Sequence, residues 1–167
     1  MKKIFLLLFV LALPLLASAQ IRFGVFSYDT VLKSMSDYIM AQRTIDGLRQ
    51  KYDSEMKRSE QEFNAKYEEF LEEQRDLVPA ILRKRQTEIQ EMMEKTVAFK
   101  QEAQRLLSQA EADALTPVKR KLNEAVAKVG AQQGYAFILN TDGDACPYIN
   151  PEMGEDATEA IRAELNK

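Results

Sequence analysis

The sequence predicts an α+β protein in which a small β body, completed by association with other copies, carries a long antiparallel helical hairpin. Strand-like segments lie before and after a helical segment that runs from 38 to 129. Within that segment, apolar residues form one narrow stripe at helical spacing, as in a coiled coil. The stripe is interrupted near its middle by the apolar, proline-containing segment 77–82, which predicts the turn between two helices.

Residues 1–19 have the features of a secretory signal peptide. A basic start at Lys2 and Lys3 precedes an apolar run from Ile4 to Leu16, and Ala17-Ser18-Ala19 matches the small-residue pattern of a cleavage site. The run of about 13 residues is shorter than the roughly 20 that a spanning helix needs. We therefore expect cleavage before Gln20 and an exported mature protein.

Composition excludes most catalytic chemistry. Removing the two lysines of the signal peptide from the 23 Lys and Arg residues leaves 21 cations against 26 acids, a net charge of −5, which does not favour nucleic acid as a partner. The chain has no histidine, so Ser-His and Cys-His nucleophile pairs and the commonest metal ligand are absent. We expect no enzyme activity, no cofactor and no metal site. The single cysteine, Cys146, permits no intrachain disulfide, and its alternatives are a small packed side chain, an intersubunit disulfide or a reactive thiol.

Residues 20–37 are assigned to the β body. The segment from Ile21 to Tyr28 is rich in aromatic and β-branched residues and predicts a strand. Asp29 is expected to cap a short helix from Thr30 to Met35, and Ser36 with Asp37 to start the next helix.

The segment 38–129 is assigned to the helical arm. A first helix is expected from Tyr38 to Leu77 and a second from Ala80 to Val129, with Pro117 kinking or breaking it and Gly130 and Gly134 as stop signals. The stripe of the first helix repeats about every 3.6 residues. It consists of Ile45, Leu48, Tyr52, Met56, Phe63, Tyr67 and Phe70.

Residues 130–167 complete the β body. A second strand is expected from Tyr135 to Asn140, then a hairpin turn at Asp142-Gly143, and a third strand from Cys146 to Asn150. The turn also resembles the start of a calcium-binding loop, but it lacks the glycine and the glutamate of an EF-hand. Asp156 with Glu159 predicts a capping box before a short final helix. Three short strands leave open sheet edges, which other copies would cover.

Nearly the whole mature sequence resembles the Skp (OmpH-like) periplasmic chaperones. The similarity lies in four segments: the first strand and helix entry, the returning helix, the strand that follows it, and the opening of the last helix. In this sequence they are residues 22–28 with 31–38, residues 115–122 with Ala125 and Val126, Gly134-Tyr135, and Asp156-Ala157-Thr158 with Ile161 and Leu165. The better-known members are basic, whereas this chain is acidic.

The resemblance implies a homotrimer in which three subunits build the β body and three helical arms enclose a cavity. It also implies ATP-independent holding of unfolded outer-membrane proteins in the periplasm. Apolar strand residues are accordingly assigned to the trimer body: Phe23, Val25, Tyr135, Phe137, Leu139 and Ile149.

Segment 77–82 would then be the tip of the arm. Its apolar residues, surrounded by cations, are candidates for gripping an unfolded chain, and the cations also suit transient contact with an anionic membrane surface. The alternative is that Pro79 starts the return helix and the apolar residues close the seam. The candidate binding residues are Leu77, Val78, Ile81 and Leu82 with Arg75, Arg83, Lys84 and Arg85.

Two functional hypotheses remain from the sequence. The first is a trimeric holdase chaperone, which needs many weak contacts and no catalytic residue. The second is a structural or adaptor coiled coil of the cell envelope, which would bind one folded partner and would not suppress aggregation of varied unfolded chains.

Overall fold

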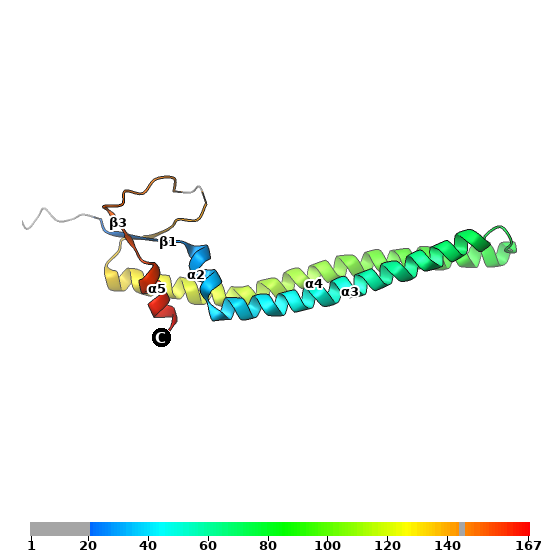
Figure 1. The fold of residues 1–167 in the computed structure, drawn as a ribbon, viewed down its shortest axis with the longest axis horizontal. Helices are drawn as coiled ribbons and strands as arrows, with labels where there is room; N and C mark the ends of the chain where they lie inside the picture. The colour runs from blue at the N-terminus through cyan, green and yellow to red at the C-terminus, as the bar shows by residue number, and fades with distance from the viewer. Residues whose placement is uncertain (1–20, 144–145) are drawn as a thin grey trace, which may run out of the picture. The chain divides into compact units, whose positions relative to one another are not determined.

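The computed structural model describes residues 21–143 and 146–167, so the predicted signal peptide and the pair Asp144 and Ala145 lie outside the described residues. The described part divides into two compact units (Figure 1). The first contains the described residues up to Lys33 together with Arg120–Lys167, and the second is Ser34–Lys119. The secondary structure is mostly helical with one small sheet, which agrees with the α+β class predicted from the sequence.

The first unit contains a three-stranded parallel sheet. β1 (Phe23–Phe26) lies in the centre, with β2 (Ile138–Asn140) on one side and β3 (Gly154–Asp156) on the other. Val25 is in register with Leu139 of β2 and with Asp156 of β3. Parallel neighbours require a long connection, and the helical segment between β1 and β2 supplies one.

The predicted third strand from Cys146 to Asn150 and its hairpin with the second strand are wrong. Asn150 instead begins a turn: its backbone oxygen accepts hydrogen bonds from the N–H groups of Met153 and Gly154, both at 3.1 Å. Pro147 and Pro151 have no N–H to donate to a strand ladder, so this segment cannot pair regularly. The chain pairs with β1 only after the turn, as β3, and the two other strands are shorter than predicted.

The sheet depends on glycines at two places of close approach. A Cβ atom at Gly24, in the central strand, would lie 3.0 Å from ring carbons of Tyr135 and 3.2 Å from Cγ1 of Ile138. A Cβ atom at Gly154 would lie 3.0 Å from the ring of Phe23. Larger residues would therefore push the neighbouring side chains away from the sheet.

Helix α2 (Tyr28–Ser34) starts two residues earlier than predicted and is capped differently. Oγ of Ser27, not the carboxylate of Asp29, accepts the Thr30 N–H at 3.1 Å. The carboxylate of Asp142 accepts the Ser27 hydroxyl and the Asp29 N–H, each at 2.6 Å. The predicted hairpin turn at Asp142-Gly143 is wrong, because both outer strands pair with β1 in parallel; the chain bends there, with a positive φ of 71° at Gly143, and Asp142 contacts the start of α2.

Helix α4 (Pro79–Gln133) continues four residues beyond the predicted end at Val129. The helix is not broken at Pro117, and Gly130 lies inside it. Gly134, with φ of 68°, ends α4 in a Schellman motif. In that motif the Tyr135 N–H donates to the Gly130 oxygen at 3.0 Å, and the Gly134 N–H donates to the Ala131 oxygen at 3.4 Å.

The final helix α5 (Thr158–Leu165) does not form the predicted capping box. Oδ1 of Asp156 accepts the Thr158 N–H at 2.9 Å, but Glu159 pairs with Arg162 at 2.9 Å instead of reaching back. The helix buries Ile161 completely. The other buried apolar side chains of this unit come from β1, α2, α4 and the start of α5: Phe26, Val31, Leu32, Leu122, Ala125, Val129 and Ala157.

The second unit is an antiparallel helical hairpin of α3 (Ser36–Glu73) and the part of α4 up to Lys119 (Figure 1). The rings of Tyr52 and Phe99 meet across the two helices at a centroid distance of 6.2 Å. Further along, the hydroxyl groups of Ser59 and Thr96 lie 3.1 Å apart. In the predicted stripe of α3 only Ile45 is buried and most of the other members are half-buried, as expected where two helices cover each other without a third layer.

Both ends of α3 differ from the prediction. The helix begins at Ser36, and the residue before it, Met35, makes no side-chain capping bond, so Ser36 is not the cap. It ends at Glu73, four residues before the predicted end at Leu77.

Candidate functional site

The turn between α3 and α4 occupies residues 74–78. The Gln74 N–H still donates to the Phe70 oxygen at 2.9 Å, and the Asp76 N–H donates to the Glu73 oxygen at 3.0 Å, so the chain leaves α3 gradually. Pro79 is the first residue of α4. A proline suits this position because its missing N–H would have no partner within the helix.

The apolar residues at this turn differ in exposure. The exposed fractions of Val78 and Ile81 are 58% and 46%, whereas Leu77 and Leu82 are half-buried. On α3 just before the turn, Tyr67 and Leu71 are 42% and 45% exposed. The four predicted apolar residues therefore divide into an exposed pair and a pair that packs against the hairpin.

The predicted cations also divide into two kinds. Arg75 and Arg83 are exposed, and neither forms an ion pair within residues 21–143 and 146–167. Lys84 and Arg85 both pair with Glu88, at 3.6 Å and 2.9 Å. Arg75 and Arg83 thus carry the positive charge that remains available at the turn.

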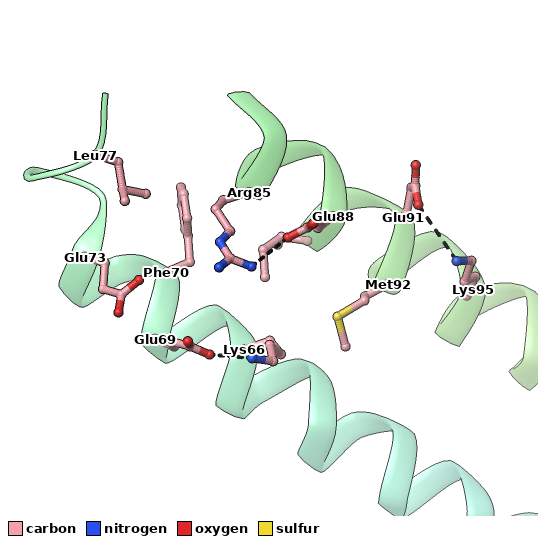
Figure 2. Close-up of a pocket in the computed structure, with 11 residues that line it drawn as sticks. Lys66, Glu69, Phe70, Glu73, Leu77, Arg85, Glu88, Glu91, Met92 and Lys95 are labelled. Carbon is pink, nitrogen blue, oxygen red and sulfur yellow. Dashed lines mark hydrogen bonds and ion pairs between the residues drawn. The ribbon is translucent and has the colours of Figure 1, made fainter. Parts of the chain in front are cut away.

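A cavity of about 300 Å³ lies between α3 and α4 close to this turn. Figure 2 shows Phe70 and Leu77 from the α3 side and Arg85 and Met92 from α4 directed toward the space between the helices. We call this space the tip cavity. Its lining consists of Lys66, Glu69, Phe70, Glu73, Leu77, Arg85, Glu88, Ile89, Glu91, Met92 and Lys95.

Ion pairs surround the mouth of the tip cavity. Lys66 contacts Glu69 at 2.6 Å, and the hydrogen bond from this lysine holds the pKa of Glu69 below its usual value. Arg85 likewise lowers the pKa of Glu88 through their hydrogen bond. The carboxylates of Glu69 and Glu88 therefore stay ionised at neutral pH.

Other kinds of site are not seen in the described part of the chain. Residues 21–143 and 146–167 contain no group of three or more Asp, Glu or Cys side chains that could hold a metal ion. Within the same ranges, no helix has the length and the apolar character needed to cross a bilayer.

Comparison with known families matches residues 22–165 to the model of the OmpH-like outer membrane proteins. The chain belongs to the OmpH-like family. Among solved structures it is similar to a proposed OmpH-like outer membrane chaperone from Caulobacter crescentus CB15, with a TM-score of 0.70 and 18% identity over 86% of this chain and 83% of that one. At this identity the likeness shows a shared fold. The search of curated proteins returned no match.

In this OmpH-like chain, most residues predicted for the trimer body meet on one face of the sheet. Phe23 stacks on Phe137 with 5.3 Å between ring centroids. The space at Gly154 is bordered by Phe23, Val25 and Ile149, and the register puts Leu139 beside Val25. Phe137 remains 46% exposed.

Tyr135 is the exception in that set. Its ring lies against Gly24, which stands between Phe23 and Val25 in β1. Successive residues of a strand point to opposite faces of the sheet, so Gly24 belongs to the face opposite Phe23 and Val25. Its hydroxyl donates to Glu155 at 2.9 Å, and Arg22, which pairs with Glu155 at 2.8 Å, lies over the ring at 5.5 Å. Tyr135 therefore belongs to a polar cluster on the other face of the sheet.

The tip cavity is the feature that sequence reasoning missed. Phe70 was predicted as part of the apolar stripe of the first helix, and Arg85 was counted only as a cation near the turn. One signal could have found it: Arg85 lies three residues after Leu82 and four before Ile89, a position where the seam calls for an apolar side chain.

Proposed function

We propose that this protein is an ATP-independent holdase chaperone that binds unfolded outer-membrane proteins in the periplasm and prevents their aggregation. Membership of the OmpH-like family supports a chaperone role, as does the fold shared with the proposed chaperone from Caulobacter crescentus. The observation that carries the proposal is the exposed apolar pair Val78 and Ile81 at the end of the helical hairpin. Next to it lie Arg75 and Arg83, which form no ion pair with any residue that the structure describes.

An exposed apolar patch bordered by cations is suited to binding an unfolded chain, because the apolar side chains of such a chain are exposed. The contacts at such a patch are weak and unspecific, which lets a client leave again. The cations are also available to an anionic membrane surface, as a transient contact. The proposal includes a homotrimer, in which the face with Phe23 and Phe137 is covered by other copies, and it includes no catalytic residue.

The first experiment is aggregation suppression. An outer-membrane β-barrel protein unfolded in urea is diluted into buffer, and light scattering is recorded with and without the mature protein from Gln20 onward. We expect strong suppression by the unchanged protein and clearly weaker suppression by a Val78→Ser, Ile81→Ser double variant, because it removes the exposed apolar surface of the turn.

The matched control is Met93→Ser, Val97→Ser, which removes two α4 side chains that are each 50% exposed. A larger loss from this pair than from the tip pair would move the grip from the tip to the helix sides. No suppression by the correctly assembled protein would contradict the holdase proposal and favour the adaptor.

A further inference from the structure

We propose that the tip cavity is an anchor site for an aromatic side chain of an extended client segment that carries a lysine or arginine next to the aromatic residue. The inference rests on the proposed function. It adds a second contact with the client, which is more selective than the contact made by the exposed pair Val78 and Ile81.

The floor of the tip cavity suits a flat apolar group. Phe70, Leu77, Ile89 and Met92 supply its apolar lining, and its volume of about 300 Å³ is at the lower end of the range for ligand pockets. The thioether of Met92 is flexible and makes favourable contacts with aromatic rings. A single aromatic side chain therefore matches both the size and the chemistry of this space.

The cavity remains open because Arg85 occupies a seam position without filling it. Its guanidinium group is held by Glu88 at 2.9 Å, and 44% of its side chain stays exposed. An apolar residue in this place would pack against Phe70 and close the space between the helices. The opening is thus a consequence of one charged residue between the apolar residues Leu82 and Ile89.

The charges at the mouth favour a cationic neighbour. Lys66 pairs with Glu69, Lys95 pairs with Glu91, and Glu88 pairs with both Arg85 and Lys84. The remaining lining acid, Glu73, forms no ion pair within the described part of the chain, so its carboxylate is available to a cation. A lysine or arginine beside the bound ring could pair with it, whereas an acidic neighbour would be repelled.

The test uses NMR of the assembled mature protein with ¹³C-labelled methionine methyl groups. The probe is the blocked hexapeptide Gly-Ser-Phe-Lys-Ser-Gly. We expect a saturable shift of the Met92 methyl signal and none of the Met93 signal, because Met93 is the sequence neighbour that does not line the cavity. Replacing Phe by Ala in the peptide should abolish the shift.

A pair of matched variants tests the charge. Glu73→Gln should weaken binding of this peptide about twofold to fivefold, the range of an exposed ion pair, and should not affect a peptide with Ser in place of Lys. Glu72→Gln, at the adjacent position outside the lining, should change neither. Equal effects of the two variants would overturn the assignment of the cationic neighbour to Glu73.

Light scattering separates this inference from the proposed function. A silent Met92 signal together with suppressed aggregation would overturn the anchor site and leave the holdase intact. A shifted Met92 signal without suppression would retain the site and overturn the holdase.

Discussion

At the scale of single residues, Gly24 shows how tightly the small sheet is built. The central strand passes so close to Tyr135 and Ile138 that a Cβ atom would come within 3.0 Å of the tyrosine ring. A second glycine, Gly47, lies in α3, where an added Cβ would meet nothing within 4 Å. The two positions therefore respond to the same substitution in opposite directions.

Gly24→Ala should lower the free energy of unfolding by about 1 to 3 kcal/mol, because the extra methyl group must displace packed neighbours. Gly47→Ala should raise it by about 0.5 to 1 kcal/mol, because alanine restricts the unfolded chain and suits a helix interior. Urea unfolding followed by circular dichroism measures both. A stabilising Gly24→Ala would show that the close approach at β1 is relaxed in solution.

At the scale of elements, the start of α2 depends on a segment far away in the sequence. Asp142 accepts hydrogen bonds from the Ser27 hydroxyl and the Asp29 N–H, and these bonds lower its pKa, the hydroxyl bond contributing most. A helix start is a favourable place for a carboxylate because the N-terminal N–H groups lack partners. The negative charge of the Asp142 carboxylate thus stabilises the start of α2.

This arrangement predicts a dependence of stability on pH. The pKa of Asp142 is lower in the folded than in the unfolded chain, so its contribution is complete above the unfolded value of about 3.9 and is lost as the pH falls through the lower, folded value. Asp142→Ala should lower the melting temperature at pH 7 and have less effect near pH 2. An equal effect at both pH values would mean that the lost contact is not electrostatic.

At the scale of the whole molecule, the apolar face of the sheet predicts association. Phe137 is 46% exposed while stacked on Phe23, which is a costly surface to leave in water. If this face forms the proposed trimer, Phe137→Asp should shift the protein from trimer to monomer in sedimentation velocity. Val97→Asp, which places the same charge at an exposed residue of the hairpin, should remain trimeric; a trimeric Phe137→Asp would place the interface elsewhere.

The helical hairpin was predictable from the sequence because the repeat of apolar residues in a helix is visible within one continuous stretch of the chain. The stripe from Ile45 to Phe70 and the break at Val78-Pro79 determine two antiparallel helices. Gly134 was a recognisable stop because a positive φ at the end of a helix favours glycine. Helix ends were less accurate, since Ser27 and Met35, not Asp29 and Ser36, precede the helices.

Three features were decided only by the tertiary structure, because each depends on residues distant in sequence. The third strand of the sheet is Gly154–Asp156, beside β1, and not the segment at Cys146, since Asn150 and two prolines turn the chain first. The cap of α2 needs Asp142, more than a hundred residues later. The tip cavity forms where Arg85 of one helix and Phe70 of the other line the same space, and the pattern within either helix does not say which residues of the two helices face each other.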